Sequence, residues 1–232
     1  MKAIILAGGE GTRLRPITYE IPKPLIPVKK RPLLNHAIDF LSTVGVDQIY
    51  VIISKEHNKD FQLWQKTWKG NIKIKPRFIL EARPQGTFVA LRKVKSFMKN
   101  GNFIVMNGDS LFDLNFSKII SFHTTNKNLA TACLSRTNTK GNYIVPAVAT
   151  DRKIKSMKRK TVNPGTTYIC CGLYIFNSKI FSHDNHKKNF LDIESGIFPG
   201  LIKNKELFGY KTSGRFFDCG TLESWTKAIF MW

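Results

Sequence analysis

Acidic residues are scarce in this sequence, and cysteines are scarcer. The 232 residues include 16 Asp and Glu against 37 Lys and Arg, so the formal net charge is +21 at pH 7. The four cysteines show no C-x-x-C spacing, which excludes the common zinc and redox motifs. No apolar run reaches transmembrane length, and the apolar residues before Gly8 are too few for a signal peptide. These absences predict a cytoplasmic protein without disulfides and without a membrane partner.

The chain also lacks internal repeats, low-complexity linkers and any clear break in composition. Its length suits one large α/β domain better than two small ones. A chain of this size can bury a core without disulfides or a structural metal. We therefore predict a single domain over residues 1–232.

The surplus of basic residues favours an anionic partner, such as nucleic acid, an acidic membrane surface or a phosphate-bearing ligand. The basic residues are scattered along the chain, with one dense cluster at 153–160. No basic motif interleaved with aromatic residues, as in known nucleic-acid-binding modules, is present, so we expect no nucleic-acid partner. The overall charge has two interpretations: a general bias in residue usage, or steering of anionic ligands toward a site.

Short β-branched runs alternate with amphipathic segments, which predicts a Rossmann-like, mixed and mostly parallel sheet flanked by helices, an α/β fold. We expect strands at 2–7, 48–54, 75–80, 103–107, 129–135, 144–150, 167–176 and 207–211. Helices are expected at 33–44, 87–98, 115–125, 190–203 and 222–229. Ligands of such sheets bind outside the carboxyl ends of the strands, so the segments that follow the strands form the candidate site.

The first predicted strand runs directly into a glycine-rich turn, Leu6-Ala-Gly-Gly-Glu-Gly-Thr-Arg13. The backbone N–H groups of the three glycines can form an anion-binding nest. Thr12 adds a hydroxyl donor, and Arg13 adds a planar cation suited to polyphosphate. The dinucleotide fingerprint would need a third glycine where Leu14 stands, and a Walker A loop would need Gly-Lys-Ser/Thr. We predict a phosphate-binding loop here rather than a plain strand–helix turn.

A second motif follows at Pro22-Lys-Pro-Leu25, where two prolines are expected to hold Lys23 in an extended segment with little backbone freedom. A lysine fixed beside a phosphate loop can serve as a point charge for phosphate. Together, the two motifs resemble the signature of the sugar-1-phosphate nucleotidylyltransferases, or nucleoside-diphosphate-sugar pyrophosphorylases. Weaker matches extend the resemblance to 217–225. The chain looks most like short single-domain members such as the heptose- and mannose-1-phosphate guanylyltransferases.

The resemblance implies the nucleotide-diphospho-sugar transferase fold and transfer of a nucleotidyl group from an NTP to a sugar 1-phosphate or related phosphorylated acceptor. It implies nucleotide binding by residues 1–110 and acceptor binding by residues 111–232. A homo-oligomer is compatible with it. The implied nucleotide-binding residues are Leu6, Ala7, Gly8, Gly9, Gly11, Thr12, Arg13, Lys23, Glu81, Gly86 and Thr87. The implied catalytic residues are Arg13, Lys23 and Asp109.

Two aspartates match the metal-binding positions of the family. Asp109 follows the buried run 103–107 in an Asn-Gly-Asp sequence, which would also suit a simple turn. The second match is Asp218, in Phe217-Asp-Cys-Gly-Thr221. Carboxylates combined with water and phosphate oxygens form the ligand set that Mg²⁺ prefers. The implied cofactor is Mg²⁺, held by Asp109 and Asp218.

The segment Glu81-Ala-Arg-Pro-Gln-Gly-Thr87 resembles the family's nucleobase-binding segment. Gly86 and Thr87 match that pattern, whereas Gln85 stands where leucine is common. Glu81 aligns with a base-contacting position, and its carboxylate offers only acceptors. Guanine presents two adjacent N–H donors that a carboxylate can accept together, so Glu81 favours GTP. The alternative is an exposed glutamate in a loop.

Two segments depart from the family pattern on the acceptor side. Tyr143 is retained, but Ile144 replaces a glycine that normally leaves room for the sugar. Lys160 keeps the cation that meets the acceptor phosphate, but Arg159 replaces a glutamate that reads sugar hydroxyls. A guanidinium pairs well with a carboxylate or a second phosphate, so an acidic or modified acceptor is favoured, unless Arg159 simply points to solvent. The implied acceptor-binding residues are Tyr143, Arg159, Lys160, Gly172 and Glu194.

The implied reaction is an in-line displacement at the α-phosphorus of the NTP. A phosphate nucleophile is already ionised at pH 7, so alignment and charge neutralisation suffice. Arg13 is expected on the departing pyrophosphate, Lys23 on the α-phosphate and Lys160 on the acceptor phosphate. Two alternatives compete with this enzyme: a catalytically silent paralogue that binds a nucleotide-sugar and regulates a partner, and a nucleic-acid-binding protein.

Overall fold

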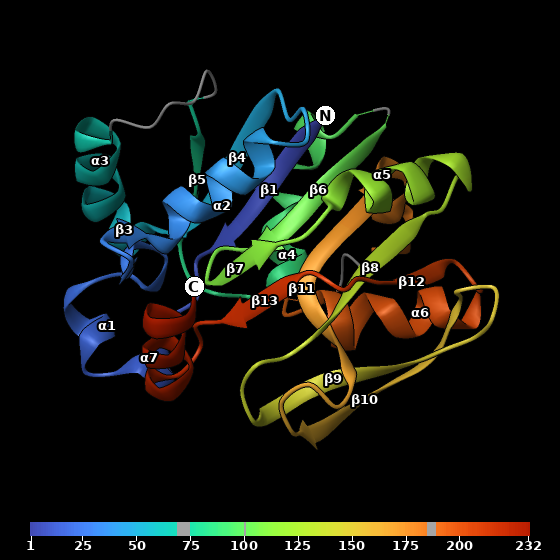
Figure 1. Cartoon of the computed structure of the whole chain (residues 1–232). Helices are drawn as coiled ribbons and strands as arrows, with labels where there is room; N and C mark the ends of the chain where they lie inside the picture. Colours follow the sequence, from blue (N-terminus) through green and yellow to red (C-terminus); the bar gives the residue numbers. More distant parts are fainter. Residues whose placement is uncertain (69–74, 100, 185–188) are drawn as a thin grey trace.

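The computed structural model describes residues 1–68, 75–99, 101–184 and 189–232. A seven-stranded sheet forms its centre, with the strand order β12-β8-β11-β6-β1-β4-β5 (Figure 1). Neighbouring strands run parallel except where β11 pairs with β6 and β8. The strands are β1 (Lys2–Ala7), β4 (Gln48–Ser54), β5 (Arg77–Glu81), β6 (Asn102–Asn107), β8 (Ala130–Arg136), β11 (Tyr168–Asn177) and β12 (Leu207–Lys211).

Helices cover both faces of this sheet because its central strands are apolar on both sides. On one face, β1 packs against α2 (Leu33–Ser42), α3 (Asn58–Thr67) and α5 (Phe116–Thr125) through residues such as Ile5, Ile38 and Phe61. On the other face, the core includes α4 (Thr87–Arg92) and α6 (Phe198–Lys203), with Phe88 and Phe198 fully buried. The predicted mixed, mostly parallel α/β sheet is confirmed.

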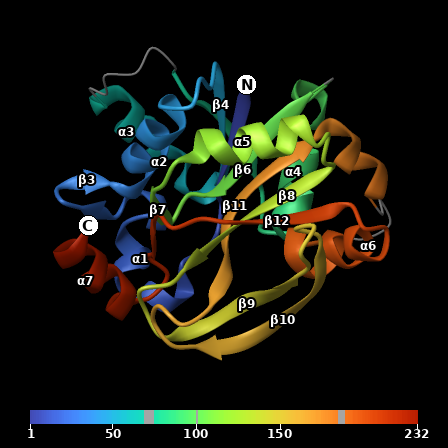
Figure 2. The same cartoon turned by 45° about the vertical axis from the view of Figure 1, so that its right-hand side comes forward.

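Three smaller sheets and two further helices surround the carboxyl ends of the central strands. Two-residue strands β2 (Pro27–Val28) and β3 (Arg31–Pro32) pair, and β7 (Ser110–Asp113) pairs with β13 (Arg215–Asp218). The short helix α1 (Ile17–Glu20) follows the glycine-rich turn, and α7 (Leu222–Met231) ends the chain. The antiparallel ribbon of β9 (Gly141–Val148) and β10 (Ile154–Val162) runs along the lower side of both views and contacts β11, β12 and α6 (Figures 1 and 2).

Several predicted elements need correction. The helix predicted at 87–98 ends at Arg92, and a separate 3₁₀ turn follows at Lys95–Phe97. The helix predicted at 190–203 begins only at the π-helical turn Ile193–Ile197, so residues 190–192 are not helical. The strand predicted at 144–150 is displaced to Gly141–Val148. The predictions omitted the elements α1, α3, β2, β3, β7, β10 and β13. The segment predicted to be extended around Lys23 is a 3₁₀ turn at Lys23–Leu25, because the Leu25 N–H donates to the Pro22 carbonyl and the Ile26 N–H to the Lys23 carbonyl.

Two observations bear on the organisation of the chain. None of the helices that the structure describes is both long and apolar enough to traverse a membrane. The division into a nucleotide-binding part at 1–110 and an acceptor-binding part at 111–232 stays a prediction.

Candidate active site

The carboxyl ends of β1, β4, β5 and β6 open into a cavity of about 420 Å³. Because these strands are parallel, their ends and the loops that follow them meet at one edge of the sheet. All the residues predicted to bind the nucleotide line this cavity, and so does Asp109. The remaining lining residues, which the sequence interpretation did not assign to nucleotide binding, are Pro24, Ile52, Pro84, Ala90, Asn107, Phe190, Asp192 and Gly220.

The glycine-rich turn is held closed by contacts to the residues that follow it. Gly11 has a φ of +65°, and its carbonyl accepts hydrogen bonds from the Leu14 N–H at 2.8 Å and the Thr18 hydroxyl at 3.0 Å. Gly9 has open space around its Cα, and Arg13 lines the cavity. The turn therefore presents accessible backbone and a cation beside the end of β1, as a phosphate-binding loop requires.

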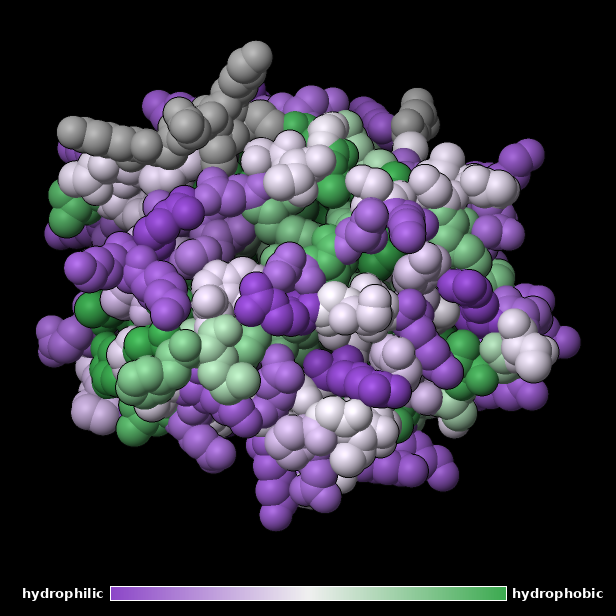
Figure 3. Space-filling model, in the orientation of Figure 1, coloured by the Kyte–Doolittle hydropathy of each residue, from purple (hydrophilic) through white to green (hydrophobic). Residues whose placement is uncertain are grey.

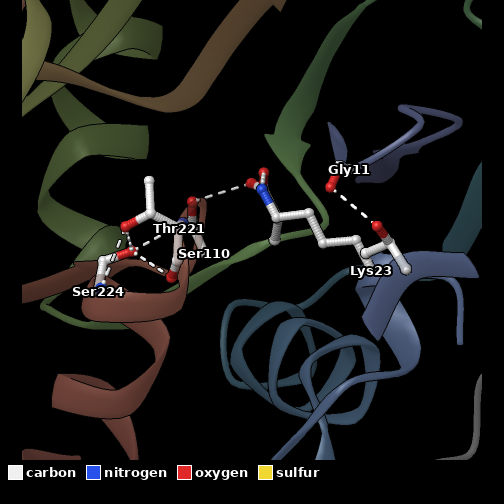
Figure 4. A network of polar contacts seen from close by, with 7 residues as sticks. Gly11, Lys23, Ser110, Thr221 and Ser224 are labelled. Atoms are coloured by element: carbon white, nitrogen blue, oxygen red, sulfur yellow. Dashed lines mark hydrogen bonds and ion pairs between the residues drawn. The ribbon is translucent and has the colours of Figure 1, made fainter. Parts of the chain in front are cut away.

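Lys23 and Asp109 form an ion pair beside this turn. Lys23 is 8% exposed, and its ammonium donates a hydrogen bond to Asp109 Oδ2. Burial raises the pKa of Asp109, but the charge and hydrogen bond of Lys23 outweigh it and hold that pKa below its usual value. Figure 4 shows Lys23 and Gly11, from the N-terminal segment, on one side of this network and Ser110, Thr221 and Ser224 on the other. The carboxylate of Asp109 is therefore ionised at neutral pH.

Strand pairing brings Asp218 next to Asp109. Asp218 pairs with Ser110 in the β7–β13 ladder, and the Cys219 N–H donates to the Asp109 carbonyl at 3.1 Å. Burial and the neighbouring charge of Asp109 raise the pKa of Asp218, while Lys23 and Arg13 lower it. A Cβ on Gly220 would lie 2.7 Å from Asp218 Oδ1 and 2.9 Å from Arg13 Nη2, so Gly220 lies directly against both side chains.

The pair of aspartates meets the requirements of Mg²⁺ binding only in combination with other ligands. Within the described residues, no group of three or more His, Cys, Asp and Glu side chains is arranged to hold a metal ion. Mg²⁺ usually keeps several waters and binds through one or two carboxylates plus substrate phosphates. The like-charge repulsion that raises the pKa of Asp218 is what a bound cation would relieve.

Glu81 is buried at the end of β5 and is 4% exposed, so the alternative of an exposed loop glutamate is wrong. Burial raises its pKa, and a backbone hydrogen bond from Gln85 and the charge of Lys93 oppose this shift. Its Oε1 atom is buried without a hydrogen-bond partner among the described residues. An unpaired buried acceptor is costly, and Glu81 lines the cavity, so a ligand that donates hydrogen bonds would stabilise it.

On the acceptor side, none of the predicted residues lines the cavity itself. Glu194 lies in the turn just after Asp192, and its carboxylate accepts a hydrogen bond from the Tyr174 hydroxyl. Gly172 lies against Asn107, because a Cβ there would be 2.3 Å from Asn107 Nδ2. Gly172 therefore lies directly behind the lining residue Asn107, whereas Glu194 follows the lining residue Asp192 by two positions in the chain.

The remaining predicted acceptor residues lie on the β9–β10 ribbon. The Tyr143 hydroxyl is 2.7 Å from the Thr139 hydroxyl, and Tyr143 pairs with Lys160 across the ribbon. Arg159 pairs with Ile144, is exposed, and donates to the Asn142 carbonyl at 3.4 Å. Successive residues of a strand point to opposite faces, so Arg159 and Lys160 lie on opposite faces of the ribbon.

Known proteins resemble this chain in sequence and in fold. The sequence profile of the nucleotidyl transferase family matches residues 2–230. The mannose-1-phosphate guanyltransferase of Kluyveromyces lactis is 31% identical over 224 residues, which cover 95% of this chain. The chain spans only 61% of the length of that relative.

Two solved structures are similar over nearly the whole chain. A provisionally named glucose-1-phosphate thymidylyltransferase from Bacillus anthracis, in complex with a sucrose, has a TM-score of 0.87 at 28% identity and covers 100% of this chain and 94% of its own. HddC from Yersinia pseudotuberculosis, complexed with GMP-PN, has a TM-score of 0.81 at 25% identity and covers 99% of this chain and 98% of its own.

Proposed function

The chain belongs to the nucleotidyl transferase family, and on this premise we propose that it transfers a nucleotidyl group from an NTP to a sugar 1-phosphate or a related phosphorylated acceptor. One observation carries the proposal: the glycine-rich turn, the Lys23–Asp109 ion pair and Asp218 converge at one edge of the sheet. Two cations beside a phosphate loop, together with two carboxylates, suit a reaction that redistributes charge among phosphates.

The chemistry is an in-line displacement at the α-phosphorus. An oxygen of the acceptor phosphate attacks, a new P–O bond forms, and the bond to the pyrophosphate leaving group breaks. The glycine-rich turn and Arg13 hold the β- and γ-phosphates, and Arg13 neutralises the charge that develops on pyrophosphate. Lys23 is held by Asp109 and faces the cavity, so it neutralises the α-phosphate. No residue has to remove a proton, because the nucleophile is ionised.

Asp109 and Asp218 would hold Mg²⁺ at the same place. The ion would supply Lewis acidity and a template for the reacting phosphates. The ionised state of Asp109, which Lys23 stabilises, and the repulsion between the two carboxylates prepare them for a cation.

The proposed donor is GTP. Glu81 offers the cavity a buried carboxylate with an unpaired oxygen, and guanine has two adjacent N–H groups that can donate to it. Uracil and thymine offer one such group. The similarity to a mannose-1-phosphate guanyltransferase and to HddC, which was solved with GMP-PN, supports the same donor.

A matrix of the four NTPs against candidate phosphates tests the proposed function, with pyrophosphate release as the readout. The acceptors should include mannose 1-phosphate, glucose 1-phosphate, a heptose 1-phosphate and an acidic sugar phosphate. We expect release only when one NTP, GTP, is combined with a phosphorylated acceptor. Tight nucleotide-sugar binding without release under any combination would instead favour the catalytically silent paralogue.

A further inference from the structure

Phe190 stands at the mouth of the cavity although it lies far along the chain from the phosphate loop. It is 63% exposed, and among the phenylalanines that the structure describes it is the exposed one that lines this cavity. The other two exposed phenylalanines, Phe97 and Phe230, lie elsewhere. Single exposed aromatic side chains are common on protein surfaces, so it is the position of Phe190 in the cavity lining, rather than its exposure, that points to a ligand contact.

The segment that carries Phe190 is fixed against the predicted nucleobase segment on both sides of the ring. The Leu191 N–H donates to the Gln85 carbonyl at 3.0 Å, and the Phe88 N–H donates to the Leu191 carbonyl at 2.9 Å. Before the ring, Gln85 Nε2 donates to the Asn189 carbonyl at 3.2 Å. Phe190 is thus placed beside the segment 84–88 by hydrogen bonds that precede and follow it.

Gly86 and Asp192 make further contacts between these two segments of the chain. Gly86 has a φ of +94°, and a Cβ there would lie 2.6 Å from the Leu191 carbonyl oxygen, so only glycine allows the approach. Asp192 Oδ1 accepts the Thr87 N–H at 3.0 Å at the start of α4, and the Thr87 hydroxyl accepts the Ile193 N–H at 2.9 Å. These hydrogen bonds join the two segments, so the backbone on both sides of Phe190 is held in place.

We propose that Phe190 is the platform on which the nucleobase of the bound NTP stacks. The inference rests on the proposed function and adds to it a residue that contacts the base. Glu81 can satisfy the polar edge of a base, but a base also has two apolar faces. The apolar part of the cavity lining also includes Leu6, Ile52, Pro84 and Ala90, none of which is aromatic. Among the described residues that line the cavity, Phe190 carries the one aromatic ring, so it is the group suited to a base face.

The stacking contact predicts a loss of affinity that is confined to ligands with a base. Loss of a base–aromatic stack weakens binding by about tenfold. Phe190→Ala should therefore raise the Kd for GTP by about tenfold and leave the Kd for tripolyphosphate unchanged, because tripolyphosphate meets only the glycine-rich turn and its cations. Phe190→Trp should retain or improve GTP binding. Phe230→Ala, a substitution at another exposed phenylalanine, should change neither Kd.

The experiment is a calorimetric titration of the full chain, starting with wild-type protein and GTP, ATP, CTP and UTP. The tightest NTP is then used with the variants. In addition, the indole introduced by Phe190→Trp should be quenched when a guanine base stacks on it, whereas Phe230→Trp should show no quenching by the same ligand. Circular dichroism of each variant controls for folding.

The outcomes separate this inference from the proposed function. Failure of wild-type protein to bind any NTP would overturn both. Equal NTP affinity of wild type and Phe190→Ala, with no quenching in Phe190→Trp, would overturn the stacking contact and leave the proposed function standing. An equal loss of affinity for GTP and tripolyphosphate in Phe190→Ala would also overturn it, because the ring would then act through the phosphate loop rather than on the base.

Discussion

Asp109 and Asp218 lie side by side through the β7–β13 pairing, yet their environments differ. Lys23 holds the pKa of Asp109 down against the effect of burial, whereas burial and the charge of Asp109 raise the pKa of Asp218. The two carboxylates therefore act as a unit, and removal of either charge changes what the other can bind.

We predict that Asp109→Asn and Asp218→Asn each lower kcat by about a hundredfold or more, as loss of a positioned electrostatic stabiliser does. Wild-type activity should require a divalent cation, with Mg²⁺ sufficient. Steady-state rates with titrated MgCl₂ and with excess chelator measure both effects. Asp113→Asn is the matched control, because Asp113 ends β7, the strand that follows Asp109, but is exposed and pairs with Arg215. Full activity of both variants in chelator would refute the metal assignment.

The predicted preference for GTP as the donor depends on Glu81. Glu81→Gln retains the shape of the side chain but removes its charge and one acceptor. We predict that the preference for GTP over the other NTPs falls by about tenfold, as expected for a lost charged hydrogen bond, while turnover persists. Competition between NTPs measures the ratio of kcat/KM values, with the exposed Glu56→Gln as control. Efficient use of UTP by the wild type, without any use of GTP, would show that the proposal of GTP as the donor is wrong.

At the scale of elements, hydrophobic pattern predicted the strands better than it predicted the helices. β1, β4 and β12 have the predicted limits because each is a short buried run with clear ends. α3 was missed because its apolar stripe is reduced to residues such as Phe61 and Trp64 in a polar segment. β10 was missed because the consecutive basic residues Lys158, Arg159 and Lys160 interrupt the alternation of apolar and polar residues by which a strand is predicted. Charged residues of this kind are nevertheless common on edge strands.

Residues 190–192 show why some predictions could not succeed from local pattern. Their apolar character continued the helical periodicity of the residues that follow. Hydrogen bonds between these residues and the segment 85–88 hold them outside the helix instead: Leu191 donates to Gln85 and accepts from Phe88, and Asp192 accepts from Thr87. The phosphate loop and Asp109 could be predicted because their residue types are specific at a strand end. Phe190, Asn107 and Asp192 could not, because their place in the cavity depends on long-range contacts.

The course of β10 also decides what Arg159 and Lys160 can contact. Since Arg159 and Lys160 leave the strand on opposite faces, one bound acceptor phosphate cannot be held by both. We predict that Lys160→Ala raises the acceptor KM by about tenfold through loss of a charged hydrogen bond.

If Arg159 contacts an acidic acceptor as predicted, Arg159→Glu should lose turnover mainly on acidic acceptors. Kinetics of both variants on neutral and acidic sugar phosphates measure this, and wild-type behaviour of Arg159→Glu throughout would leave Arg159 in solvent.

Helix α5 carries a group whose ionisation is coupled to stability. His123 is fully buried, its Nδ1 lies 2.9 Å from the Thr131 hydroxyl, and burial lowers its pKa to about 4. In the unfolded chain a histidine titrates near its usual pKa of about 6.5. Between these values only the unfolded state is protonated, so stability is retained above the unfolded pKa and lost as the pH falls toward the folded one.

We predict that this effect removes about 3 kcal/mol from the free energy of unfolding between pH 6.5 and 4, at about 1.4 kcal/mol for each pKa unit. His123→Gln cannot be protonated in this range, so its stability should fall by that much less over the same interval. Urea unfolding of the two proteins at several pH values gives the comparison. Parallel pH profiles for wild type and variant would contradict the assignment to His123.

At the scale of the whole molecule, the net charge of +21 remains to be explained. The face in Figure 3 is predominantly hydrophilic, and the basic residues are scattered over many elements rather than gathered at the cavity. A field of this sign attracts triphosphates over distances up to the Debye length, which falls from about 30 Å to about 10 Å between 0.01 and 0.1 M salt. A general bias in residue usage predicts no such effect on substrate capture.

The two interpretations differ in the effect of distant charges. Lys59, Lys66, Lys118 and Lys203 are exposed on α3, α5 and α6. Their replacement by Gln lowers the net charge from +21 to +17 without touching the cavity. Charges outside the cavity act on a polyphosphate through a field that salt screens, so their combined effect is small and is greatest at low salt. If steering operates, kcat/KM for the NTP should fall by about threefold at 0.01 M salt and by less than about 1.5-fold at 0.1 M, with kcat unchanged. Initial rates at both salt concentrations test this, and equal salt dependence in the two proteins would leave the charge as a property of composition alone.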